Sequence, residues 1–180
     1  MSGRPPPDTD ETWMVLRAQG GSREHLERLM VAAQDFLSRR LGPLFDEPVD
    51  AEDLLQDVLF TICRRLWTLN DARLFRPWAH RIALRAAWKA INRKRRERQR
   101  REDSVDVDSL PGVIPESTGL ELPALLNQVS PASRVVLTLH YLEGLTLEAT
   151  AAELGVAPGT VKSRLAYGLK QLREASSSLS

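Results

Sequence analysis

Apolar residues recur at intervals of three and four over much of the chain, which is the spacing that puts side chains on one face of an α-helix. Between residues 26 and 41 this pattern predicts an amphipathic helix that ends at Gly42 and Pro43. Trp13 and Leu16 indicate a shorter helix before it. No segment alternates apolar and polar residues as a half-buried strand does, so the pattern predicts an all-α protein.

Two more helices are predicted in the N-terminal half. Asp50 is a suitable N-cap for the first, whose apolar stripe continues to Leu69 and whose end we place near Asn70. Pro77 is typical of the first turn of the second helix, which we expect to continue to about Arg101. Because the second half of that helix is almost wholly basic, it must leave the core.

Residues 103–121 have a different composition, with Ser, Pro and Gly, alternating Val and Asp, and no sustained helical period. This composition is typical of a linker and predicts two small helical domains joined by a flexible, acidic segment. We therefore divide the chain into a disordered N-terminal segment (1–10), a first domain (11–102), the linker (103–121) and a second domain (122–176).

The second domain is predicted to contain a helix-turn-helix. A helix over residues 131–143 leads into the segment 144–165, which has the layout of two short helices joined by a tight turn. Thr146 is suited to cap the first helix, Gly155 to supply a left-handed turn, and Pro158 to open the second.

In the second helix of this motif, Val161 and Leu165 are expected to face inward. The residues expected to reach outward to phosphates and base edges in a major groove are Thr160, Ser163, Arg164 and Tyr167. Helical hairpins with exposed basic residues also occur in proteins that never touch DNA, so both interpretations stay open for this segment alone. Gly168 is expected to interrupt the helix, at about 1 kcal/mol relative to alanine.

Charge is strongly segregated along the chain, although the net charge is only +1. Asp46 to Asp57 holds six carboxylates and no basic residue, whereas Arg81 to Arg101 holds ten basic residues and a single acid. Glu102 to Glu121 again holds six carboxylates and no basic residue. A solvated face usually mixes its signs, so the basic segment favours a nucleic-acid partner.

The chain offers little support for an enzyme. His25, His80 and His140 have no ligand-spaced partners, and there is no glycine-rich phosphate loop or nucleophile motif, so we expect no catalytic residue, metal site or cofactor. Cys63 lies within an apolar helical stripe and is interpreted as a small buried hydrophobe. No targeting segment or bilayer-spanning stretch is found, so we expect a cytoplasmic protein.

Three stretches, in their order and separation, resemble the extracytoplasmic-function (ECF) sigma factors of the sigma-70 family: Ala51 to Leu59, Phe75 to Ala83, and Gly144 to Leu165. The resemblance implies an RNA polymerase sigma factor that binds core polymerase, recognises −35 and −10 promoter elements and promotes DNA melting. It also implies that the first domain is sigma region 2, that the second is region 4, and that there is no small-molecule substrate.

The resemblance further implies a partner for the helix that begins at Ala51. It would dock on the clamp coiled coil of polymerase through Asp53, Leu54, Gln56 and Asp57. An acidic helix face is a plausible receptor for a basic partner, and a merely solvated first turn would have the same composition. Further partners implied are the polymerase flap and a cognate anti-sigma protein, often membrane-bound, which would hold the factor at the membrane.

Both promoter elements are assigned to residues in the same way. The −10 contacts are expected from Asn70, Asp71, Arg81, Arg85, Trp88, Lys89, Arg93, Lys94, Arg95 and Arg96, with the loop from Leu69 to Leu74 holding an extruded base. The −35 contacts are expected from Thr160, Lys162, Ser163, Arg164 and Tyr167. Relatives commonly carry Asn and Asp in place of Arg85 and Lys89, and often Arg in place of Tyr167, so the resemblance does not fix the preferred bases of either element.

Two other functions compete with this interpretation. A helix-turn-helix regulator that binds operators without polymerase would account for the second domain, but it would leave the resemblance of the first domain unexplained. A sigma-like decoy for an anti-sigma protein should have lost the basic promoter surface, which this chain retains.

Overall fold

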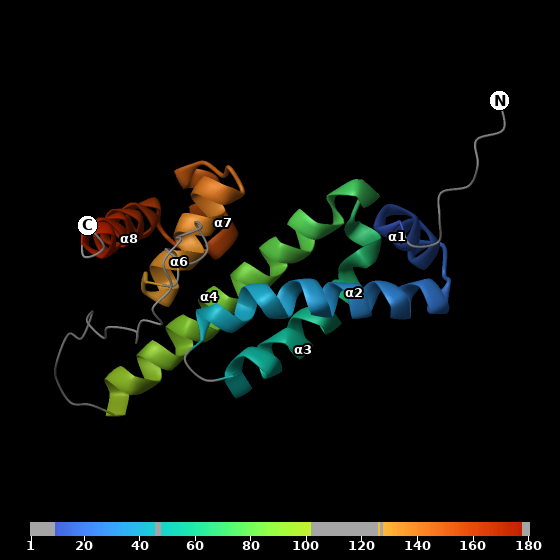
Figure 1. Ribbon diagram of the computed structural model, residues 1–180, viewed down its shortest axis with the longest axis horizontal. Coiled ribbons are helices and arrows are strands. Elements are labelled where there is room, and N and C mark those ends of the chain that lie inside the picture. The colour runs from blue at the N-terminus through green and yellow to red at the C-terminus, as the bar shows by residue number, and fades with distance from the viewer. Residues whose placement is uncertain (1–9, 46–47, 102–125, 127, 178–180) are drawn as a thin grey trace. The chain divides into compact units, whose positions relative to one another are not determined.

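The computed structural model describes residues 10–45, 48–101, 126 and 128–177 (Figure 1). Helices and turns make up this part of the chain, and no strand occurs within it, which confirms the expected all-α class. Apart from Asp10, the N-terminal segment 1–10 lies outside the described residues, as does the linker 103–121, so the predicted domain limits stay predictions.

The described α-helices are α1 (Glu11–Gln19), α2 (Arg23–Leu41), α3 (Pro48–Arg65), α4 (Phe75–Arg101), α6 (Pro131–Leu137), α7 (Leu147–Leu154) and α8 (Pro158–Ser177). They form two compact units, one from described residues within 1–42 and 48–83 and the other from those within 43–47 and 84–180. The division along the chain falls inside α4.

In the first unit, α2 packs against both α1 and α3 (Figure 1). Its core contains residues that the apolar pattern places on inner faces, including Leu29, Leu37, Ile62 and Leu66, all fully buried. Burying such a side chain contributes about 1.5–3 kcal/mol to folding. The helix period read from the sequence therefore accounts for this core.

The turn between α1 and α2 is set by glycine. Gly21 has φ +91°, a left-handed conformation that a side chain with a Cβ rarely adopts. The Ser22 N–H donates to the carbonyl of Arg17 at 3.0 Å and closes the turn. The turn leads directly into α2 and makes Gln19 the last residue of α1.

The connection from α3 to α4 differs from the sequence prediction. The helix begins at Pro48, so Asp50 lies in its first turn instead of capping it, because proline is well suited to a first helical position. It ends at Arg65, not near Asn70, and two 3₁₀ turns follow, η2 (Leu66–Thr68) and η3 (Ala72–Leu74). The second turn leads straight into α4, which starts two residues before Pro77.

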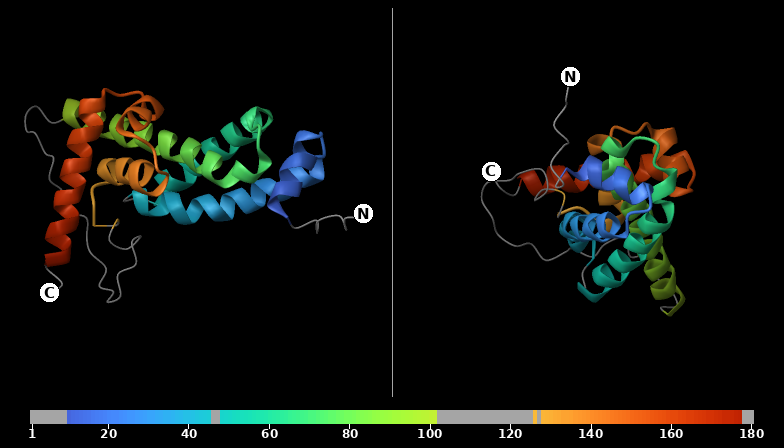
Figure 2. Two further views of the ribbon diagram at one scale, coloured as in Figure 1. Left: turned by 90° about the horizontal axis from the view of Figure 1, so that it is seen from above. Right: turned by 90° about the vertical axis from the view of Figure 1, so that its right-hand side faces the viewer.

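In the second unit, α6 and α7 both pack against α8, the long C-terminal helix in Figure 2. Val135, Leu154 and Val161, one from each helix, are buried in the core of this unit. The single helix predicted over 131–143 is α6 followed by a π-helical turn, η4 (Thr138–Leu142), in which the Glu143 N–H donates to the Thr138 carbonyl at 3.0 Å.

Gly168 lies at a tight contact between α8 and α6. A Cβ built at this position would lie 2.8 Å from Leu137 Cδ1, 3.1 Å from Ser133 Cβ and 3.3 Å from Val129 Cγ1. The helix runs through Gly168 without a break and continues to Ser177. Gly168 therefore lowers helix propensity without ending the helix, and its missing side chain is what lets the two helices approach.

Candidate nucleic-acid interface

The helix-turn-helix is built as its sequence predicts. Thr146 caps α7, since its Oγ1 accepts a hydrogen bond from the Ala149 N–H at 3.1 Å. Gly155 ends α7 with φ +67°, and the Val156 N–H donates to the Ala151 carbonyl at 3.0 Å. This geometry fixes the direction in which α8 leaves the turn.

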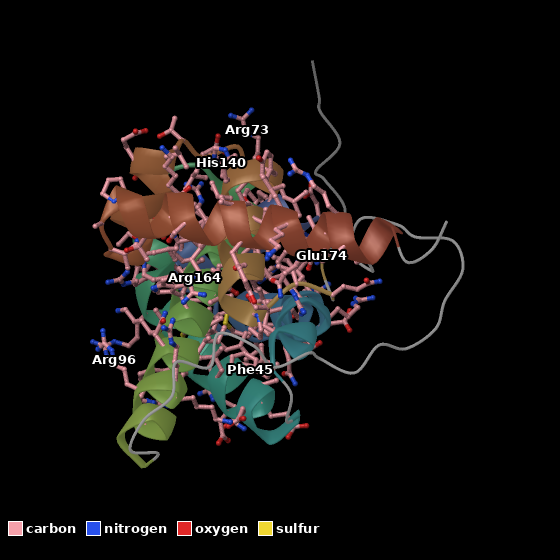
Figure 3. All side chains as sticks on the ribbon, turned by 90° about the vertical axis from the view of Figure 1, so that its left-hand side faces the viewer. Phe45, Arg73, Arg96, His140, Arg164 and Glu174 are labelled. Atoms are coloured by element: carbon pink, nitrogen blue, oxygen red, sulfur yellow. The ribbon has the colours of Figure 1, made fainter. Side chains whose placement is uncertain are left out.

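The outward face of α8 brings together most of the residues predicted for −35 contacts. Val161 and Leu165 are buried, which leaves Thr160 and Ser163 exposed near the start of the helix. Positions three, four and seven apart share a helix face, so Arg164 (labelled in Figure 3) and Tyr167, both half-buried, lie on the same stripe. Lys162 is exposed but lies off this stripe.

The basic residues predicted for −10 contacts on α4 fall into two groups. Arg81, Arg85, Lys89, Arg93 and Arg96 follow each other at three- and four-residue steps and form one basic stripe, which we call the α4 basic stripe. Lys89, Arg93 and Arg96 are exposed, and Figure 3 labels Arg96 on the outer surface of this helix. The half-buried Lys94 and Arg95 lie beside the stripe.

Trp88 presents the least surface of the predicted −10 residues. Its side chain is only 5% exposed, on the side of α4 that also buries Leu84. Its proposed contact with DNA stays a prediction.

The segment between η2 and η3 presents Asn70. Asn70 is exposed, whereas Leu69 and Ala72 on either side of the Asn70–Asp71 pair are buried. Asp71 is held within the segment: its Oδ1 accepts from the Arg73 N–H at 3.0 Å, and the Arg73 Nη2 donates to its Oδ2 at 2.8 Å. These hydrogen bonds to Arg73 lower the pKa of the Asp71 carboxyl below its ordinary value.

The acidic turn of α3 is only part of a longer exposed face. Asp53, Gln56 and Asp57 are exposed and share this face, whereas Leu54 is half-buried and lies off it. The same face continues to Phe60, which is 64% exposed and has the Arg64 guanidinium carbon 5.6 Å from its ring centroid.

The sequence interpretation missed Phe60 and also Trp67, which is 56% exposed. Both lie off the apolar stripe that the sequence predicts from Asp50 to Leu69, Phe60 in α3 and Trp67 in η2. Their position outside the stripe was the signal that could have found them.

The described residues contain no group of three or more His, Cys, Asp or Glu side chains placed to hold a metal ion. Within the same residues, no helix has the length and apolar character needed to cross a membrane. Cys63 is half-buried on α3.

Comparison with known proteins identifies the family. Residues 24–97 match Sigma-70 region 2, and residues 119–172 match Sigma-70, region 4. The RNA polymerase sigma-E factor of Streptomyces coelicolor is 34% identical over 157 residues, which cover 82% of this chain and 84% of that protein. The chain belongs to the sigma-70 family.

Other relatives extend this sigma factor's likeness to the ECF group. The ECF RNA polymerase sigma factor SigF of Caulobacter vibrioides is 32% identical over 171 residues, covering 89% of this chain and 90% of that protein. The solved structure of CnrH in complex with the cytosolic domain of CnrY aligns with a TM-score of 0.52 at 19% identity. That alignment covers 94% of this chain and 99% of CnrH, so the two share a fold.

The matched regions confirm the function implied by the sequence resemblance, that of an RNA polymerase sigma factor. The region 2 match contains α2 from Glu24, α3 and α4 up to Glu97, and the region 4 match contains the helix-turn-helix. α1 lies outside both matched ranges.

Proposed function

We propose that this sigma factor reads the −35 element with α8, captures the opened −10 element with α4 and the segment around Asn70, and docks on core polymerase through α3. The observation that carries the proposal is the outward face of α8, where Thr160 and Ser163 are exposed beside the buried Val161. A recognition helix needs this arrangement, because its polar side chains must reach base edges while its apolar side chains hold it on the domain.

Promoter melting in this scheme requires no catalytic group. Extruding a base costs a few kcal/mol, and a protein that binds the unstacked base better than the paired one supplies that free energy by binding. The exposed Asn70, between the buried Leu69 and Ala72, is suited to such a contact. The chain accordingly acts as a binding and initiation factor and not as an enzyme.

The α4 basic stripe supports binding of the phosphate backbone. Arg85 is paired with the Glu153 carboxylate at 2.7 Å, and the exposed part of the stripe is Lys89, Arg93 and Arg96. Like charges three and four residues apart on a helix repel each other, and phosphates along a strand relieve that repulsion. Binding then releases condensed counterions, so affinity depends strongly on salt. The stripe therefore supplies affinity that is independent of sequence, while Asn70 and the outward face of α8 supply base preference.

The exposed face of α3 supports docking on polymerase. Asp53 and Asp57 present carboxylates to a basic partner, and Gln56 between them offers a neutral hydrogen-bonding group. We assign this face to the clamp coiled coil and the region 4 unit to the flap. These partners place the factor in the cytoplasm with polymerase and promoter DNA.

We also propose a cognate anti-sigma partner for this chain. CnrH, which shares its fold, was solved in complex with the cytosolic domain of CnrY. A membrane-bound partner of this kind would hold the factor at the membrane until released.

The test is run-off transcription by purified core polymerase with this protein, over a promoter library with randomised −35 and −10 elements. Changing Thr160 and Ser163 together to alanine should flatten the −35 preference and leave the −10 preference intact. Changing Asp53 and Gln56 to alanine should instead weaken holoenzyme formation without altering either preference. Gln34→Ala, at an exposed α2 position outside these surfaces, is the matched control.

Each outcome bears on a separate part of the proposal. Protein-dependent transcripts with two preferred elements support it, and an unchanged −35 preference in the α8 variant removes α8 from recognition. Specific DNA binding without initiation would instead identify an operator-binding regulator. A protein with neither activity would be a decoy.

A further inference from the structure

The last residue of α1 makes two hydrogen bonds to a distant part of the chain. The Gln19 side-chain Nε2 donates to the backbone carbonyls of Leu66 and Leu69, each at 2.8 Å. A glutamine amide has two N–H donors, so this one uses both of them on a single turn. Gln19 lies outside the two ranges matched by the sigma-70 regions.

The two carbonyls flank η2, because Leu66 begins this turn and Leu69 follows it as its C-cap. The Leu66 carbonyl already accepts from the Leu69 N–H at 3.2 Å, so Gln19 adds a second donor to it. A helical turn leaves the acceptors at its end without partners within the turn, and such an acceptor is costly when it is withdrawn from water. Gln19 supplies a donor to the part-buried carbonyl of Leu69.

The opposite end of α1 contacts the chain just beyond the same segment. The Arg76 Nε, in the first turn of α4, donates to both carboxylate oxygens of Glu11, at 2.9 and 2.8 Å. α1 also packs against η2 and η3. Its two ends thus hold the backbone before Asn70 and the helix start after it.

Asn70 is consequently the exposed residue in a segment fixed on both sides. Toward α3 the constraint is the pair of bonds from Gln19, and toward α4 it is the Asp71–Arg73 pair together with the buried Phe75. Gln19 itself is held in place because Gly20 caps α1 directly after it and Gly21, with φ +91°, turns the chain toward α2.

We propose that Gln19 is a positioning residue for promoter opening, which holds the segment around Asn70 in the shape that receives an extruded base. The inference rests on the proposed function of that segment and deepens it. Gln19 does not touch DNA in this mechanism. It acts by restricting the segment before the base binds, so that less conformational entropy is lost when the base is received.

The experiment compares Gln19→Glu with Gln34→Glu. The first change keeps the size of the side chain and removes both donors, and the second makes the same charge change at the exposed α2 position. Holoenzyme is mixed with promoters that carry 2-aminopurine in the −10 element and differ only at the extruded base. The measurements are the opening rate for each base, the affinity of the closed complex, and the affinity for core polymerase.

For Gln19→Glu we expect opening on the preferred promoter to slow by about tenfold, the order expected for two lost hydrogen bonds, with a smaller difference between bases. The two affinities should equal those of Gln34→Glu. A uniform fall in all three measurements would show a merely structural role and overturn the inference.

Asn70→Ala separates this inference from the proposed function. If Asn70→Ala loses base preference and Gln19→Glu keeps it, the inference is wrong and the proposed function of the segment stands. If neither variant changes base preference, the segment does not receive the base at all. Should Gln19→Glu fail to fold, Glu11→Gln is the second variant, because it weakens the contact at the other end of α1. It should slow opening about threefold, with the same loss of base preference. Unchanged opening in Glu11→Gln would then refute the inference.

Discussion

At the scale of single residues, the Asp71–Arg73 pair makes a prediction about pH. Its hydrogen bonds keep the native pKa of Asp71 below the ordinary value of 3.8. The pair therefore contributes stability above that value, and this contribution is lost as the pH falls through the native pKa. An NMR titration of the Asp71 carboxyl should give a pKa below 3.8, and Arg73→Ala should return it toward 3.8. An unchanged pKa in Arg73→Ala would contradict this cause.

Residues whose roles depend on local chemistry could be predicted from the sequence. The cap at Thr146, the left-handed turn at Gly155 and the helix start at Pro158 each follow from one residue and its neighbours. Gln19 could not be found in this way, because its partners lie 47 and 50 positions away and are backbone carbonyls. A glutamine at a helix end carries no sequence signal for such a contact.

At the scale of elements, the contact between α6 and α8 should make Gly168→Ala destabilising, although replacing a glycine inside a helix by alanine is ordinarily stabilising. Gly168→Ala gains about 1 kcal/mol of helix propensity, but overpacking a tight contact costs roughly 1–3 kcal/mol. We expect a net loss of about 1 kcal/mol in the free energy of unfolding, measured by urea denaturation of the full chain.

Gly159 offers the matched control in the same helix. A Cβ at Gly159 would meet no atom within 4 Å, so Gly159→Ala should be neutral or stabilising. If both alanine variants gain stability equally, the close approach at Gly168 does not limit packing.

The apolar period predicted the helices better than it predicted their ends. The end of α2 and the start of α8 agree with the sequence prediction because Gly42 and Pro158 mark them. The end of α3 and the π-helical turn after α6 were missed, since 3₁₀, π and α turns have similar apolar spacing over a few residues.

At the scale of the whole molecule, the segregation of charge predicts how promoter binding responds to salt. Reversing Arg93 and Arg96 to Glu should weaken promoter complexes and reduce the slope of log affinity against log salt by about one for each lost phosphate contact. Reversing Arg23 and Arg39 together to Glu, at two exposed α2 positions away from the proposed surfaces, makes the same change in net charge and is the control. An unchanged slope in the double variant would exclude these side chains from phosphate contact.

The family and the two helical regions could be predicted from the sequence because three motifs occur in the right order and the basic residues gather in one segment. The extent of the exposed α3 face could not. Hydropathy alone assigns Phe60 to a core, and its position off the apolar stripe indicates an exposed side chain without showing how far the exposed face extends.

The hydrogen bonds of Gln19 also bear on the order in which parts of the chain fold. A helix closes its hydrogen bonds between residues four apart, whereas these bonds join positions 47 and 50 apart, and contacts across longer loops form more slowly. During synthesis α1 leaves the ribosome first, and its partners follow only when residue 69 has emerged. Both carbonyls precede α4 and α8 in the chain, so the Gln19 bonds can form before the α4 basic stripe and the recognition helix have been made. On this order, a newly made chain shapes the segment around Asn70 before it acquires its surfaces for DNA.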